Sequence, residues 1–295
     1  ILSLVYSAGL RISEVVALKP GDVDTERMCI HIRQGKGKKD RVTILSKKAV
    51  NLLASYRGIY LPALWLFPGI VPKRHISARS VESFFKKALE KNIKNLEKFS
   101  NIGLMTTVQY AGSVKEIKRF LEDRGKSVFI EKNRKTGYFG HVLGCDFSAV
   151  NSLENKVDCF IYFGSGRFHP SGFLTEKPFF ALDIERGELI DISPEIRKEI
   201  IKKELSIEKA KGMKDFVIYI SSKPGQMHPA KAGELKKKLE TKGKSVLMVS
   251  ADMLTPEKLL GIKCDVIVNT ACPRLREDSS QFKKIILNPE DVDKL

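Results

Sequence analysis

Five cysteines carry the most varied chemistry in this sequence: Cys29, Cys145, Cys159, Cys264 and Cys272. Their number is odd, their spacings are wide and no basic-then-apolar leader opens the chain, so we expect neither a disulfide framework nor secretion. Cys159 and Cys264 lie within or beside apolar strand patterns, which predicts core positions. For Cys145 and Cys272, the roles of core thiol and metal ligand both stay open.

Arg11 and Lys36 form a second candidate set, suited to phosphate chemistry. A guanidinium fork and a point cation together stabilise the negative charge that phosphoryl transfer spreads over phosphate oxygens. Lys36 belongs to a glycine-containing basic turn, Gln34–Asp40, which suits a phosphate backbone. Taken alone, the same residues are also consistent with a helix-surface cation and a solvated turn.

The charge of the chain is unevenly spread. The 295 residues hold 52 Lys and Arg against 35 Asp and Glu, a formal net charge of +17. Residues 1–98 contain 19 basic and 8 acidic residues, whereas residues 99–295 contain 33 and 27. The imbalance indicates two unlike halves, the first suited to a polyanionic partner such as DNA.

A hydrophobic fraction of 42% is enough for a packed core, and the length suits two domains. The longest uncharged apolar run, residues 59–71, is shorter than the ~20 residues of a bilayer span and contains Pro62 and Pro68. We therefore expect no membrane segment. The chain begins at Ile1, within a helical pattern, so we expect it to be a fragment.

The elements of the first 90 residues are mainly helical. Apolar spacing predicts a helix over residues 1–18, and serine caps predict two more over about 46–56 and 77–90. Between them, residues 28–33 and 41–45 alternate like two strands joined by the basic turn, which predicts a β-hairpin.

From about residue 91, strands alternate with helices, which predicts parallel α/β units. The expected strands are 102–107, 127–130, 159–163, 179–182, 216–220, 245–249 and 266–269, and the expected helices are 114–123, 194–211, 229–241 and 256–260. We predict three regions: a truncated, mainly α fragment over 1–90 and two parallel-sheet α/β domains over 91–211 and 212–295.

The first region resembles the catalytic domain of the tyrosine recombinase (phage integrase) family. Tyr6–Val23 and Ile32–Ile44 match in the family's order and spacing, over about residues 1–90. The resemblance implies that Arg11 clamps the scissile phosphate and that Lys36 donates a proton toward the leaving oxygen. The family's downstream His-x-x-Arg box and tyrosine nucleophile do not follow. We therefore expect no recombination by this chain alone, and exposed apolar helix faces on the truncated half.

From about residue 92 the chain resembles the diphthamide synthase family, the Dph2-type 2-(3-amino-3-carboxypropyl)histidine synthases. Five blocks in family order carry the resemblance: Thr106–Gln109, Gly140–Ser148, Tyr162–Pro170, Ser222–Gln226 and Val268–Arg274. His141 departs from the family, which usually has Gln there. The resemblance implies α/β domains with small parallel sheets, acting in the cytoplasm as a homodimer or with a relative of the same family.

The resemblance also implies the chemistry. A [4Fe-4S] cluster held by three cysteines, one per domain, binds S-adenosylmethionine, and a 3-amino-3-carboxypropyl radical adds to a histidine of translation elongation factor 2. Cys145 and Cys272 map onto the ligands of the middle and last domains. The third ligand lies in a first domain whose place the recombinase-like segment takes, so we expect this polypeptide alone to form little product.

Two loops are candidates for binding S-adenosylmethionine. The first is Gly164–His169, which offers Gly164, Ser165, Gly166, Arg167 and His169; a tight turn that needs glycine explains the same residues equally well. The second loop follows the strand 216–220 and contains Lys223 and Gln226.

Three hypotheses remain for the whole chain: an incomplete diphthamide synthase-type transferase, a DNA-binding recombinase remnant, and a non-catalytic composite of two gene fragments. The first rests on about 200 residues and the second on about 90. In the third, a real fusion or a gene-assembly junction joins the two near residues 88–98.

Overall fold

A computed structural model describes residues 1–33, 35, 39–69, 73–132, 137–146, 148–164, 169–183 and 187–295. The chain forms two compact units, unit 1 over Ile1–Ser193 and unit 2 over Pro194–Leu295. The boundaries predicted at residues 90 and 211 stay predictions. None of the helices in the described ranges is long and apolar enough to cross a membrane.

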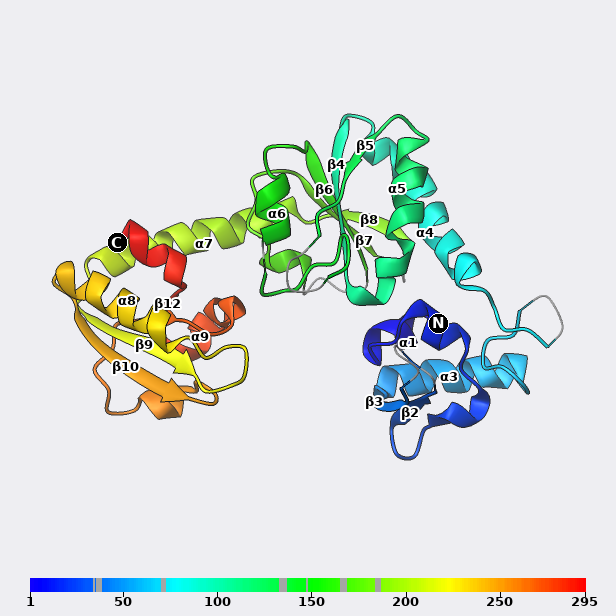
Figure 1. Cartoon of the computed structure of the whole chain (residues 1–295), viewed down its shortest axis with the longest axis horizontal. Coiled ribbons are helices and arrows are strands. Elements are labelled where there is room, and N and C mark those ends of the chain that lie inside the picture. Colours follow the sequence, from blue (N-terminus) through cyan, green and yellow to red (C-terminus); the bar gives the residue numbers. More distant parts are fainter. Residues whose placement is uncertain are drawn as a thin grey trace. The chain divides into compact units, whose positions relative to one another are not determined.

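The recombinase-like segment (residues 1–90) has short helices around a small sheet (Figure 1). Its elements are α1 (Leu2–Ser7), α2 (Ile12–Val16), the 3-10 helix η1 (Pro20–Asp22), β1 (Val23–Asp24), β2 (Cys29–Ile32), β3 (Arg41–Ile44), α3 (Lys47–Tyr60) and α4 (Ala78–Asn92). The strands are antiparallel in the order β1-β2-β3. The predicted helix over 1–18 is divided because Gly9 adopts φ +61° between α1 and α2.

The rest of unit 1 is an α/β domain with a five-stranded sheet in the order β5-β4-β6-β7-β8. Its elements are η3 (Ile93–Leu96), β4 (Asn101–Thr106), η4 (Val108–Ser113), α5 (Val114–Glu122), β5 (Ser127–Phe129), α6 (Ser148–Leu153), β6 (Cys159–Gly164), η5 (Pro170–Gly172), β7 (Phe179–Asp183) and β8 (Glu188–Asp191). Strands β5, β4, β6 and β7 run parallel. The pattern did not predict β8, which is antiparallel because the connection from β7 is too short for a crossover.

The two faces of this sheet pack against different helices. Along the central strand β6, Cys159, Ile161 and Phe163 join the cluster that contains side chains of α4 and α5, as the alternation of a strand requires. Figure 1 shows α4 and α5 along one side of the sheet and α6 on the other. All six residues of β6 are buried, as expected for a strand covered on both faces.

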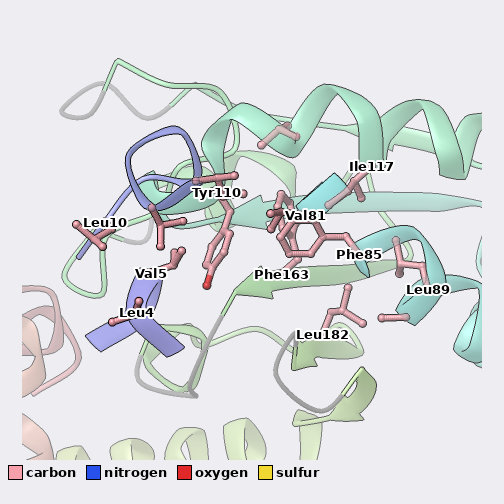
Figure 2. Close-up of a cluster of buried hydrophobic side chains, with 14 of the residues drawn as sticks. Leu4, Val5, Leu10, Val81, Phe85, Leu89, Tyr110, Ile117, Phe163 and Leu182 are labelled. Carbon is pink, nitrogen blue, oxygen red and sulfur yellow. The ribbon is translucent and has the colours of Figure 1, made fainter. Parts of the chain in front are cut away.

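One hydrophobic core joins the recombinase-like segment to the α/β domain. Figure 2 shows Leu4 and Val5 of α1 beside Tyr110 of η4, and Phe85 of α4 next to Phe163 of β6. The ring centroid of Phe85 lies 5.6 Å from that of Tyr110 and 6.0 Å from that of Phe163. The expectation of bare apolar faces is thus wrong for α1, which is covered, but holds for the end of α3, where Ile59 and Tyr60 are exposed.

Unit 2 is a second α/β domain, with a fully parallel sheet in the order β10-β9-β11-β12. Its elements are α7 (Ser193–Lys211), β9 (Asp215–Ser221), α8 (Pro229–Thr241), β10 (Ser245–Ala251), η6 (Pro256–Leu259), β11 (Val266–Asn269), η7 (Pro273–Asp278), α9 (Ser279–Phe282), β12 (Ile285–Leu287) and η8 (Pro289–Lys294). Helices α7 and α8 cover one face with Ile207, Ala210, Ala232, Leu235 and Leu239. The predicted helix over 256–260 is a 3-10 helix instead.

These elements confirm the predicted fold class: parallel α/β sheets preceded by a mainly helical segment with a hairpin. Every strand predicted from residue 91 onward lies within two residues of an observed strand boundary. The parallel order places the carboxyl ends of neighbouring strands at one edge of each sheet, which is where ligand sites of such folds lie.

Candidate functional site

The five-stranded sheet of unit 1 is the middle sheet of the chain. The segment that precedes Cys145 extends the carboxyl edge of this sheet. His141 forms a parallel bridge with Thr106, the last residue of β4. The Thr106 amide donates to Gly140 O at 2.7 Å, and the Val142 amide donates to Thr106 O at 2.9 Å. The Thr106 hydroxyl donates to Phe163 O at 2.7 Å and so links this segment to β6.

Cys145 lies at the tip of the tight turn that follows. Leu143 and Asp146 form an antiparallel bridge across the turn, which leaves the thiol exposed. Asp146 Oδ1 accepts hydrogen bonds from the amide and the hydroxyl of Ser148, at 3.0 and 2.6 Å, and so fixes the start of α6. The turn thus presents Cys145 beyond the carboxyl end of β4.

His141 is buried at the same edge, with 8% of its surface exposed. Burial lowers the pKa of His141, and the charge of His169 lowers it further. Gly164 is the last residue of β6. The ring of His169 stacks against that of Tyr162, with 6.4 Å between the ring centroids. The structure therefore brings Gly164, His169 and Cys145 to one edge, while Ser165, Gly166 and Arg167 lie outside the described residues.

In unit 2, Cys272 follows β11 at the equivalent edge. Asn269, only 1% exposed, ends the strand and holds the loop: its Nδ2 donates to Cys272 O at 2.7 Å, and its Oδ1 accepts from the Ala271 amide at 3.0 Å. The Thr270 hydroxyl donates to Tyr219 O at 2.8 Å. Cys272 is half-buried and directly precedes η7, at its N-cap position.

Lys223 and Gln226 lie at this same edge of unit 2. They follow β9, the strand that pairs with β11, in a turn where the Gln226 amide donates to Lys223 O at 3.1 Å. The Lys223 amide donates to the buried Ser221 hydroxyl at 3.2 Å. The structure thus supports a shared edge for this loop and the Cys272 loop; their binding role stays a prediction.

The other cysteines of the α/β domains are core residues. Cys159 is fully buried, and burial followed by the charge of Asp158 raises its pKa to about 12. Cys264 is 3% exposed, and burial raises its pKa as well. Both thiols stay protonated near neutral pH and make poor metal ligands. Each α/β domain therefore has one accessible and one inert cysteine.

The α/β domains thus contain two accessible thiols, Cys145 and Cys272, and thiolates are suited to bind iron. Cys29 of β2, in the recombinase-like segment, is half-buried as well and is not among the cysteines that the resemblance implies as ligands. Among the described residues, however, no three His, Cys, Asp or Glu side chains gather as the ligands of a metal ion. The assignment of Cys145 and Cys272 to the three-cysteine set that the resemblance implies stays a prediction. The described part of the chain contains no complete set of cluster ligands, and we assign its residues no step through a cluster.

Arg11 of the recombinase-like segment is held by Glu14. Its backbone amide donates to Glu14 Oε2 at 2.8 Å and its Nη1 donates to Oε1 at 3.2 Å. Arg41 joins the same carboxylate, with Nη2 donating to Oε2 at 2.7 Å. Lys36 lies outside the described residues, so its predicted role stays a prediction.

The sequence reasoning missed the residues that position these groups. Asn269 and Glu14 both have a local signal: an amide side chain between a buried strand and a turn, and an acid three residues after a helix N-cap. The bridge between His141 and Thr106 has none, because it joins residues 35 positions apart.

The fold and these edges define a class of protein: parallel α/β domains that each present one accessible cysteine beyond the end of a strand. Residues 72–294 match the family described as putative diphthamide synthesis protein. The chain belongs to this family. Residues 1–102 match the phage integrase family, and the two matches overlap over residues 72–102, which contain α4.

Individual relatives show the same division. The chain is 32% identical over 212 residues to the 2-(3-amino-3-carboxypropyl)histidine synthase of Pyrococcus horikoshii, a match covering 70% of this chain and 60% of that protein. A crystal structure titled Dph2 from P. horikoshii with a 4Fe-4S cluster matches with a TM-score of 0.62 at 31% identity, covering 70% of this chain and 61% of that one. The chain thus spans about 60% of the length of these relatives.

The recombinase-like segment has its own relative. A putative integrase/recombinase of Sinorhizobium fredii is 51% identical over 69 residues, which cover 23% of this chain and 28% of that protein. The identity is higher than in the α/β domains, but the match is much shorter.

Proposed function

We propose that the chain is a diphthamide synthase-type transferase component and that the 295-residue polypeptide alone transfers little or no 3-amino-3-carboxypropyl group. The complete reaction moves this group from S-adenosylmethionine to a histidine of translation elongation factor 2. The observation that carries the proposal is that the two accessible cysteines of the α/β domains, Cys145 and Cys272, stand at the positions that the family resemblance assigns to cluster ligands.

The surroundings of the two thiols support this assignment. Each lies beyond the end of a parallel strand that is fixed by a buried polar residue: Thr106 ends β4 in one unit, and Asn269 ends β11 in the other. Such rigid loops suit ligands that must stay in place while a substrate reacts. A third cysteine ligand, from a related chain in the cytoplasm that has the first domain, would complete the set.

The test is anaerobic incubation of the full chain with iron, sulfide, dithionite and S-adenosylmethionine. Cleavage of the bond from the sulfonium to the 3-amino-3-carboxypropyl group leaves methylthioadenosine, and labelled substrate reports transfer to elongation factor 2. We expect methylthioadenosine at the level of an iron-free control. The P. horikoshii synthase, treated identically, serves as the active reference.

Matched variants make either outcome interpretable. Sustained methylthioadenosine formation would contradict the proposed impairment if it depends on the two candidate ligands. In that case Cys145→Ala or Cys272→Ala abolishes it, Cys159→Ala does not, and the polypeptide is competent alone. Iron binding that ignores both accessible cysteines would contradict their assignment as ligands. The interpretations as a DNA-binding remnant and as a non-catalytic composite stay predictions.

A further inference from the structure

Strand β10 forms one edge of the sheet of unit 2, and this edge is open (Figure 1). All seven residues of β10, Ser245–Ala251, pair with β9 on one side. The structure describes every residue of unit 2, and no strand of this unit pairs with the other side of β10. Leu247 is 49% exposed and Met248 is 43% exposed. Because neighbouring residues of a strand face opposite sides of a sheet, the rim is accessible from both faces.

The backbone groups along the open side of β10 belong to alternate residues. The Ser245 amide donates to the carbonyl that precedes β9, at 2.9 Å, and Ala251 O accepts from the amide that follows β9, at 3.0 Å. Both residues thus direct their backbone groups toward β9. The residues that alternate with them direct their amides and carbonyls away from β9. Val246, Met248 and Ser250 therefore present a row of hydrogen-bonding groups along the edge.

The other sheet edges in the described part of the chain are short or charged. Strands β1, β5 and β12 have two or three residues each. Strand β3 carries Arg41, and β8 carries Glu188 and Asp191. Short length and charge keep an edge strand from pairing with another chain. Strand β10 has neither protection, since its seven residues include no charge, proline or glycine. This edge therefore suits a partner strand.

We propose that β10 pairs antiparallel with β10 of a second copy of this chain, about a two-fold axis that relates the two Met248 residues. In this register Leu247 packs beside Val249 of the second copy, and Val246 lies opposite Ser250. Val246, Met248 and Ser250 are the residues with outward backbone groups. Each of them then meets a residue whose groups point back at it, as the hydrogen-bonded pairs of an antiparallel ladder require.

The sequence around β10 favours a second copy as the occupant. The same register places Lys244, just before the strand, opposite Asp252 of the other copy, so that opposite charges meet at both ends. Lys244 Nζ donates to Lys211 O at 2.6 Å, and Asp252 Oδ1 accepts from Lys258 Nζ at 2.6 Å. Because both groups already have partners in their own copy, the charges select the direction of pairing and add little affinity.

The two-fold arrangement also closes the assembly. Each copy uses the same surface, so the contact is complete once two copies have joined. The combined sheet ends on both sides at β12, which has only three residues. The family resemblance implies a dimer or a related partner but assigns no surface to it. The inference goes beyond the proposed function, because β10 contains no candidate cluster ligand and its test needs no activity.

The first experiment is sedimentation velocity of the full chain over a range of concentrations, with a reducing agent so that no disulfides form. We expect a monomer–dimer equilibrium with a dissociation constant on the order of 10 μM, because an edge pair buries less surface than a standard interface.

Charge variants at the two-fold axis test the contact. Met248→Lys places like charges opposite each other and should raise the dissociation constant at least about tenfold. Mixing Met248→Lys with Met248→Glu should restore a dimer. Leu260→Lys, at a position 79% exposed and outside β10, is the matched control and should have no effect. Thermal unfolding of each variant shows that unit 2 stays folded.

Cysteine variants test the register. The Cα atoms of the two Met248 residues are expected about 5.5 Å apart, which a disulfide can span, so diamide should cross-link Met248→Cys into a dimer. In Ser250→Cys the two thiols are four residues, or ~13 Å, apart along the strands and should not cross-link. The parent chain, treated identically, measures any cross-linking through its native cysteines.

The proposal is overturned if the full chain stays monomeric at concentrations about tenfold above the expected dissociation constant. It is also overturned if Met248→Lys leaves the dimer unchanged with unit 2 folded, or if Ser250→Cys cross-links and Met248→Cys does not. Growth beyond the dimer as concentration rises would contradict the closed two-fold pair.

Discussion

The α/β domain of unit 1, which is the middle domain of the chain, and unit 2 both consist of a parallel sheet with helices. They differ in which helices cover the sheet. In unit 2, α7 and α8 cover one face, and both helices belong to that unit's own α/β sequence. In the middle domain, the corresponding core includes Leu4, Val5 and Leu10 of the recombinase-like segment. One sheet is covered by its own helices, and the other shares its core with a segment similar to a different family.

Helix α4 explains how two unrelated sequences share one core. It buries Val81, Phe85, Ala88 and Leu89, spaced so that they form one face of a helix. This face contacts the middle sheet as well as α2 and α5. Because both family matches include α4, the helix serves both parts of the chain, and the overlap of the matches has a structural counterpart.

The largest expected effect is the loss of a ring from this shared core. Phe85 is fully buried against Tyr110 and Phe163, so Phe85→Ala should cost unit 1 about 3–5 kcal/mol of unfolding free energy. Phe216→Ala, at a 1% exposed position of β9, is the counterpart in unit 2. Differential scanning calorimetry should show each variant lowering a different transition. An unchanged unit 1 in Phe85→Ala would contradict the shared core.

The second effect concerns the reactivity of the accessible and the buried cysteines of the α/β domains. Cys145 is exposed and Cys272 half-buried, whereas Cys159 and Cys264 are buried with raised pKa values. Iodoacetamide at pH 7.5 should modify the first pair at least about a hundred times faster, since alkylation needs an accessible thiolate. Peptide mass spectrometry over time measures this. Equal rates for Cys145 and Cys159 would remove the distinction between accessible and core thiols.

A smaller effect is expected in how the stability of unit 1 depends on pH. Burial, then the charge of His169, holds the pKa of His141 below the usual 6.5. Below pH 6.5 the unfolded chain binds this proton before the folded one does, so unit 1 loses stability as the pH falls toward the lowered pKa. His141→Gln should flatten that slope in urea unfolding, and His228→Gln, exposed in unit 2, should not. A slope unchanged by His141→Gln would assign the pH dependence elsewhere.

The smallest effect is expected at the ion pair between α4 and α5. Lys86 Nζ lies 3.2 Å from Glu116 Oε2, with the side chains 41% and 32% exposed. Lys86→Gln should cost about 0.2–1 kcal/mol, and less at high salt, because water screens the pair. Lys202→Gln, in a similarly exposed pair of unit 2, is the control for a general charge effect. A cost above that of Phe85→Ala would mean that charge, not burial, holds α4.

Local patterns in the sequence predicted most of this architecture. Buried strands such as β6 and β11 are short apolar runs, and α4 is preceded by the N-cap Ser77, whose hydroxyl accepts from the Ser80 amide at 3.0 Å. Strand β8 was missed because an exposed edge strand lacks such a run. The prediction that Cys145 and Cys272 are cluster ligands rests on the family resemblance, since neither cysteine belongs to a metal-ligand spacing.

The contact between the two parts of the chain was beyond sequence reasoning. Nothing local to Leu4 or Val5 indicates that Tyr110, more than 100 positions away, lies beside them, because tertiary packing leaves no mark on spacing. The cavity lined by Arg11 and Gln109 depends on the same packing. Arg11 had a predicted role, but its surroundings follow from the fold alone.

Native-state hydrogen exchange of the full chain tests most directly whether the recombinase-like segment and the middle domain are one folded unit. We predict that the slowest amides of β2, such as Ile30, and of β6, such as Ile161, open with the same free energy and that Phe85→Ala lowers both together. Exchange of the β2 amides at a far lower free energy, unaffected by Phe85→Ala, would mean that the segment is an independent appendage, and would contradict the shared core.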